Sequence, residues 1–83
     1  MANTKSAKKR AAQALRRRDR NRAYRSRMRT AVKKARTALA AGEENAPQLL
    51  AEAIRVVDRT AQKGVVHKNT AARTKSRLAK IAR

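Results

Sequence analysis

Eight arginines lie within the fourteen residues from Arg16 to Arg29, where the sequence reads RRRDRNRAYRSRMR. The planar guanidinium group binds phosphate through paired hydrogen bonds, and it stacks on bases better than a lysine ammonium does. Asp19 is the single acidic residue of this run, and the run offers almost nothing apolar from which a core could be built. The segment therefore favours a polyanion as its partner.

Charge is spread unevenly over the rest of the chain, whose net charge is +19. Residues 1–36 contain 15 basic residues and one acidic residue, residues 37–62 two basic and four acidic, and residues 63–83 seven basic and none acidic. This asymmetry is typical of proteins that bind nucleic acid or an anionic membrane. A solvated helix face laced with ion pairs is a poor interpretation, because a single acid cannot pair with 15 bases.

Residues for catalysis or metal binding are missing from the sequence. Cysteine is absent, His67 is the sole histidine, and we find no paired carboxylates, phosphate-binding glycine loop or nucleophile with its base. We therefore predict no enzymatic activity, no cofactor and no metal site. His67 is expected to pack in a loop or to bind RNA. We also find no secretory or membrane-spanning segment, and the arginine-rich pattern continues too far for a mitochondrial transit peptide.

Helix signals divide the chain into three helices. The first is predicted over residues 6–41, with Thr4 or Ser6 as N-cap and Gly42 after its end. The second is predicted over residues 47–63, with Asn45 as N-cap and Pro47 in the first turn. The third is predicted over residues 69–83, with Asn69 as N-cap.

Apolar stripes at helical spacing predict how the three helices pack. The first helix carries a stripe of Tyr24, Met28, Ala31, Val32, Ala35, Ala38 and Leu39; the second Leu50, Ala53, Ile54, Val57 and Ala61, flanked by Leu49 and Val56; the third Ala71, Thr74, Leu78 and Ile81. Before Tyr24 the first stripe meets Asn21, Arg17 and Arg10, so the start of that helix has no face to bury. We predict a single all-α domain over residues 1–83: a three-helix antiparallel bundle with a long, protruding, basic N-terminal helix.

The arginines of the first helix fall on two flanks when residues are placed at about 100° intervals. One flank holds Arg18, Arg22, Arg25, Arg29 and Arg36, and the other holds Arg16, Arg20, Arg27 and Lys34. A helix lying on one duplex needs one basic face. Two opposite flanks favour a rod wedged between two phosphate surfaces. Because Tyr24 is the one aromatic residue, contacts to phosphate and sugar should dominate over base stacking.

Three sequence motifs resemble those of the family formed by the twentieth protein of the bacterial small ribosomal subunit. They are ANTKSAKKR at residues 2–10, RNRAYRSRMRT at residues 20–30, and KGVVHKNTAAR at residues 63–73 followed by KSRL at residues 75–78. The resemblance implies a cytoplasmic protein of the bacterial ribosome that binds 16S ribosomal RNA directly and early in subunit assembly. It also implies contacts to the 5′ domain and to the long penultimate helix of the 3′ minor domain, with few protein neighbours.

The expected RNA-binding residues come from the basic first helix and from a second basic region around the third helix. They are Lys5, Lys8, Lys9, Arg10, Arg16, Arg17, Arg18, Arg20, Arg22, Arg25, Arg27, Arg29, Lys34, Lys63, His67, Lys68, Asn69, Arg73, Lys75, Arg77 and Lys80. Two alternatives stay open. A histone-like DNA-binding protein should have a wedge for the minor groove or a dimer interface, and a membrane-active helix should have bulky apolar residues.

Overall fold

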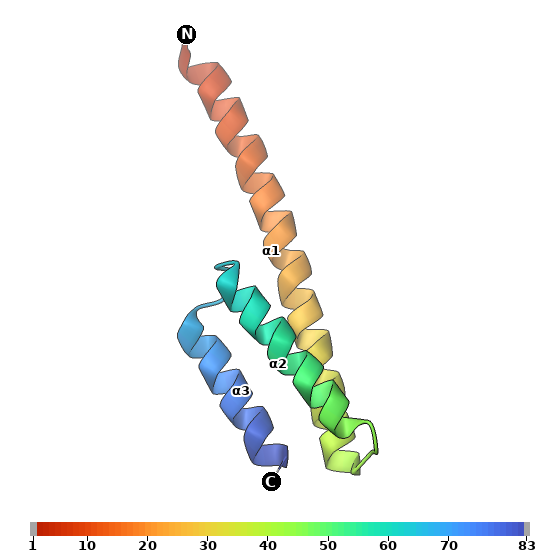
Figure 1. Ribbon diagram of the computed structural model, residues 1–83. Coiled ribbons are helices and arrows are strands. Elements are labelled where there is room, and N and C mark those ends of the chain that lie inside the picture. Colours follow the sequence, from red (N-terminus) through yellow and green to blue (C-terminus); the bar gives the residue numbers. More distant parts are fainter. Residues whose placement is uncertain (1, 83) are drawn as a thin grey trace.

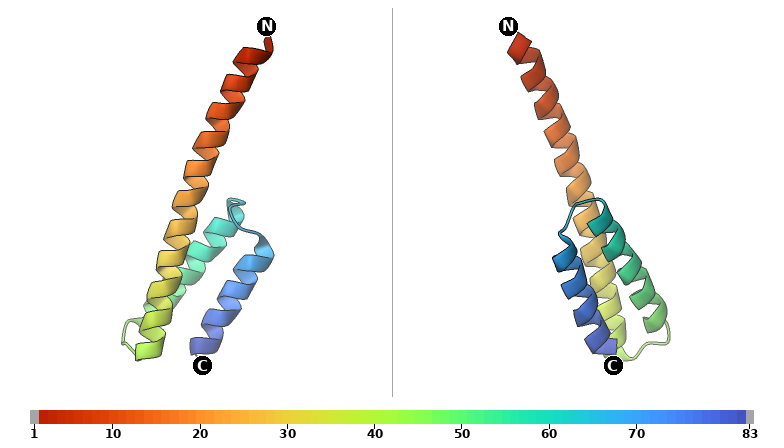
Figure 2. Two further views of the ribbon diagram at one scale, coloured as in Figure 1. Left: turned by 180° about the vertical axis from the view of Figure 1, so that it is seen from behind. Right: turned by 60° about the vertical axis from the view of Figure 1, so that its left-hand side comes forward.

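Three helices and two short connections make up the protein in this computed structural model, which describes residues 2–82 (Figure 1). Helix α1 spans Ala2–Ala41, α2 spans Ala46–Gln62 and α3 spans Lys68–Ala82. Each helix runs antiparallel to the one before it, and the end of α3 lies near the connection between α1 and α2 (Figure 2). The expected all-α bundle with a long first helix is confirmed.

Helix α1 projects far beyond the other two helices. Both views show α2 and α3 beside its second half only, while its first half extends away from the bundle (Figures 1 and 2). The described residues measure 62 × 20 × 13 Å, and their radius of gyration is 17.2 Å. A compact chain of this length would have a radius of gyration of about 12 Å. The predicted projection is therefore confirmed.

The observed helix starts correct two predictions. Helix α1 already includes Thr4 and Ser6, so neither is its N-cap; alanine and lysine, which are good helix formers, let the helix begin at Ala2. Helix α3 begins at Lys68, which makes His67 the N-cap and places Asn69 inside the helix. Helix α2 starts at Ala46, directly after the expected N-cap Asn45, although no side-chain capping bond forms there.

Glycines end α1 and α2 in the same way. Gly42 has φ +68° and Gly64 has φ +74°, left-handed values that residues with a Cβ rarely adopt. After α1, the Glu43 N–H donates to the Ala38 carbonyl at 3.0 Å. After α2, the Val65 N–H donates to the Thr60 carbonyl at 3.2 Å. These bonds satisfy carbonyls that a helix end leaves free, and they turn the chain back toward α1.

The core lies where the three helices meet. Ala35 of α1, Ala53 of α2 and Leu78 of α3 are fully buried, with Ala31, Val32, Leu49 and Leu50 packed around them. Small alanines at the contact let α1 and α2 approach closely, but they bury little apolar area. Every residue of the predicted α1 and α2 stripes is buried or half-buried. Ile81, expected on the inner face of α3, is instead 38% exposed.

Candidate nucleic-acid interface

The projecting part of α1, residues 4–20, is a basic rod that the rest of the described chain does not cover. Each residue from Thr4 to Arg20 is exposed, and Asn21 is the first half-buried residue along the helix. This boundary agrees with the position at which the apolar stripe ends in the sequence. The basic side chains of the rod are therefore all free to meet a partner from outside.

Two arginine-lined depressions lie along α1, one on the rod and one that extends from the end of the rod alongside the bundle. Arg18, Arg22, Arg25 and Arg29 line one of them together with the hydroxyl residues Ser26 and Thr30. Arg16, Arg17 and Arg20 line the other together with Gln13. The first depression thus contains four of the five arginines that the helical spacing assigns to one flank, and the second contains Arg16 and Arg20 of the other flank together with Arg17.

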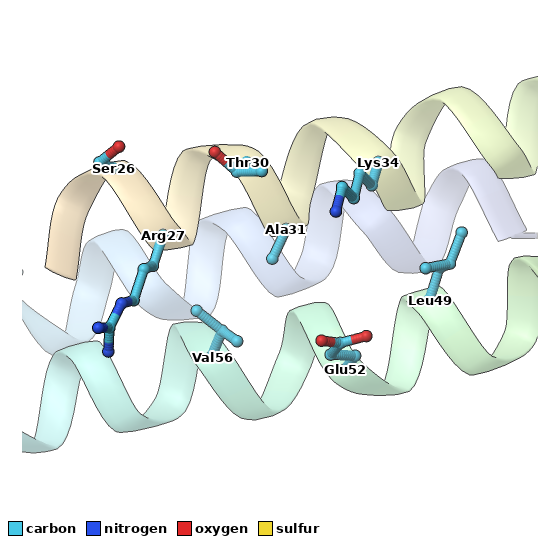
Figure 3. A pocket seen from close by; sticks show the side chains of 8 residues that line it. All are labelled: Ser26, Arg27, Thr30, Ala31, Lys34, Leu49, Glu52 and Val56. Carbon is cyan, nitrogen blue, oxygen red and sulfur yellow. The ribbon is translucent and has the colours of Figure 1, made fainter. Parts of the chain in front are cut away.

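The second flank runs on into a groove between α1 and α2. Arg27 and Lys34 of α1 line this groove opposite Leu49, Glu52 and Val56 of α2 (Figure 3). The groove was not predicted from the sequence. No local motif marks Glu52, and only the packing of α2 against α1 brings its carboxylate beside these cations.

A second basic surface lies on α3 and at its start. Arg73, Arg77 and Lys80 are exposed at helical spacing, which places them on one side of α3, and Lys63, Lys68 and Asn69 are exposed before and within its first turn. His67 closes this end of the helix: the Asn69 N–H donates to Nδ1 of His67 at 3.1 Å, and the Ala71 N–H donates to its carbonyl at 3.1 Å. The histidine is therefore a capping residue, a role that the sequence alone did not indicate.

Lys75 differs from the other predicted RNA-binding residues. It is half-buried, whereas the others are exposed, and its Nζ lies 2.8 Å from Oδ1 of Asp58 on α2. Within residues 2–82 this is the ion pair that the structure records. In the described part of the chain, no arginine of the two flanks is recorded in an ion pair with an acidic residue.

Residues 2–82 offer neither a metal site nor a membrane-spanning helix. No group of three histidine, cysteine or carboxylate side chains in residues 2–82 could hold a metal ion. None of the helices described is both long and apolar enough to span a bilayer.

Comparison with known proteins links this arrangement to one family. A family model described as ribosomal protein S20 matches residues 2–83. A protein named small ribosomal subunit protein bS20 from Symbiobacterium thermophilum is 60% identical over 80 residues, which cover 96% of this chain and 83% of that protein. Proteins of the same name from Roseiflexus sp. and Nitrosomonas europaea are 59% and 51% identical, over 96% and 94% of this chain and 88% and 91% of their own lengths.

Proposed function

Because the chain belongs to the ribosomal protein S20 family, we propose that it binds the RNA of the small ribosomal subunit directly and holds two RNA segments together. In this role it is a structural constituent of the ribosome and not an enzyme. The observation that carries the proposal is the pair of arginine-lined depressions on two flanks of α1, one on the exposed rod and one that extends from the end of the rod alongside the bundle.

The two depressions suit two separate phosphate surfaces. Arginine binds phosphate with two parallel hydrogen bonds, and Ser26 and Thr30 add hydroxyl donors to one depression. A single duplex contacting one flank would leave the other flank's charges facing water. RNA on both sides would use both flanks and would also relieve the repulsion between neighbouring arginines.

The partner implied by the family resemblance is 16S ribosomal RNA, through its 5′ domain and the long helix of its 3′ minor domain. We assign the rod to the bridge between these two segments, and the exposed side of α3 with Arg73, Arg77 and Lys80 to an additional phosphate contact. A-form RNA exposes phosphates and 2′-hydroxyls and hides its major-groove base edges. A basic helix with one aromatic residue fits recognition by shape.

The bridge is tested with two labelled 16S RNA fragments that associate when the protein is added. The variants Arg18→Ala/Arg22→Ala and Arg16→Ala/Arg20→Ala should each weaken the joint complex while retaining the fragment bound by the intact flank. The control Arg55→Ala/Arg59→Ala removes the same charge from exposed positions of α2 and should change little. A flank whose loss has no effect on the joint complex would contradict the bridge.

Salt dependence and competition separate RNA binding from the DNA alternative. If about 6–10 phosphates are neutralised, affinity should fall about 10³–10⁵-fold between about 50 and 200 mM salt. At about 150–200 mM salt, where non-specific binding is suppressed, the 16S fragments should displace duplex DNA. A flat salt response, or a preference for the DNA, would overturn direct ribosomal RNA binding.

A further inference from the structure

The groove between α1 and α2 combines chemical groups that a bare phosphate surface does not need. Its volume is about 330 Å³, at the lower end of the ~300–1,000 Å³ range of small-molecule sites. Ala31, Leu49 and Val56 form its apolar part, Arg27 and Lys34 extend into it from α1, and Glu52 comes from α2 (Figure 3).

Glu52 is out of place on a surface that binds only phosphate. Its negative charge would repel an RNA backbone laid along the groove. The structure records no ion pair within 4.0 Å between this carboxylate and Arg27 or Lys34, so its oxygens are not taken up by direct contact with these cations. A carboxylate accepts hydrogen bonds and donates none, so the group that fits it must be a donor.

We propose that this groove holds one unstacked guanosine of the bound RNA. The N1–H and N2–H₂ of guanine form two adjacent donors that match the two oxygens of the Glu52 carboxylate. Cytosine and adenine each offer a single amino group there, and uracil offers only its N3–H. The base would lie on Ala31, Leu49 and Val56, and its 5′-phosphate would meet Arg27 or Lys34.

The groove lies at the end of the flank that contains Arg16 and Arg20, so RNA bound along that flank can also reach the groove. Arg27 belongs both to the flank that contains Arg16 and Arg20 and to the lining of the groove. RNA that follows this flank toward the bundle therefore arrives at the cationic side of the groove. Single-stranded bulges and loops, whose bases can be turned outward, are the parts of RNA that proteins read by sequence. This inference rests on the proposed RNA binding and adds one base-specific contact to it.

Chemical probing of the full-length protein bound to 16S RNA tests the proposal. Kethoxal reports access to the N1 and N2 edge of unpaired guanine, and hydroxyl radicals report access to the backbone. With the unchanged protein, one unpaired guanosine should be protected from kethoxal within the backbone footprint. With Glu52→Gln the guanosine should react as it does in free RNA, while the backbone footprint remains.

A matched control and a base substitution complete the test. Glu44→Gln makes the same change outside the groove, in the connection between α1 and α2, and should keep the guanosine protected. Replacing the protected guanosine with adenosine should weaken RNA binding by the unchanged protein about 5- to 150-fold, the range for a bidentate base contact. The same replacement should barely change RNA binding by the Glu52→Gln variant. A backbone footprint without a guanosine that responds to Glu52 would overturn this inference alone. If the unchanged protein gave no backbone footprint on 16S RNA, the proposed function itself would be overturned.

Discussion

The Nζ of Lys75 lies 2.8 Å from Oδ1 of Asp58, and this ion pair ties α3 to α2. The two side chains are 39% and 49% exposed. Exposed ion pairs contribute about 0–1 kcal/mol, because water screens the charges and both side chains lose conformational freedom. The pair therefore has a larger effect on where the Lys75 ammonium points than on the stability of the fold.

Lys75 should consequently contribute less to RNA binding than its neighbours on α3. We expect Lys75→Ala to lower RNA affinity less than Arg73→Ala does, because Arg73 is exposed and no ion pair of the described chain involves it. A double-mutant cycle of Lys75→Ala and Asp58→Ala, measured by urea unfolding, should give a coupling of at most about 1 kcal/mol. Equal losses of RNA affinity for Lys75→Ala and Arg73→Ala would contradict this assignment.

The second prediction concerns the cap that His67 provides for α3. Nδ1 of His67 accepts the Asn69 N–H at 3.1 Å, so replacing the ring with a methyl group leaves that donor without its partner. His67→Ala should lower stability by about 0.5–2 kcal/mol, as losses of other helix caps do, and should speed hydrogen exchange at the start of α3. His67→Asn supplies a side-chain oxygen that can accept the same bond and should recover most of the loss. Equal stability of the alanine and asparagine variants would show that the cap has no energetic role.

The third prediction compares two leucines of opposite environment. Leu78 is fully buried among three helices, whereas Leu15 on the rod is 59% exposed. Leu78→Ala should lower the free energy of unfolding by about 2–5 kcal/mol through lost burial and the cavity left behind. In so small a core this should unfold much of the free protein. Leu15→Ala should change stability by less than about 0.5 kcal/mol, and thermal unfolding followed by circular dichroism measures both effects.

The sequence predicted the packing of α1 because burial there follows helical spacing. Tyr24, Met28 and Leu39 recur on one face, and the side chains found at those positions are indeed half-buried. The same spacing gave the point at which packing stops, since Arg17 and Arg10 cannot enter a small apolar core. Gly42 also marked the end of α1 correctly, because it supplies the left-handed conformation that this turn uses.

Two kinds of feature were beyond the sequence: the choice between neighbouring residues that can play the same local role, and contacts between helices. Nothing local distinguishes Asn69 from His67 as the start of α3, since both can accept a bond from the helix backbone. Asp58 and Lys75 lie far apart along the chain, so their ion pair exists only because α2 and α3 pack together. Glu52 likewise gains its position beside Arg27 and Lys34 from the α1–α2 packing.

The fourth prediction concerns Asn21, at the boundary between the rod and the bundle. Its Oδ1 is buried and has no hydrogen-bond partner. A buried acceptor left unsatisfied costs about 1–3 kcal/mol, and leucine at this position would extend the apolar stripe toward the rod. Asn21→Leu should therefore raise the free energy of unfolding, measured in urea. Gln13→Leu, a similar exchange on the exposed rod, should leave it nearly unchanged, and a stability loss in Asn21→Leu would contradict this account.

The last prediction is that RNA supplies much of the folding free energy of the rod. Residues 4–20 bury no side chain against the bundle, and like charges four residues apart, such as Arg16 and Arg20, repel one another. Tertiary packing, which stabilises most protein helices, is therefore missing from this part of α1. Circular dichroism of the free protein should show less helix than α1, α2 and α3 contain together, with a gain when 16S RNA is added.

A glycine in the rod gives this coupling a quantitative test. Ala11→Gly disfavours the helix by about 1 kcal/mol. If the rod folds as it binds, this cost reduces the free energy of RNA binding, and RNA affinity should fall about fivefold. Unfolding of the bundle should be unaffected, because Ala11 is exposed and lies before the point at which packing begins. Full helicity in the free protein would refute coupled folding, since the rod would then be formed before any RNA contact.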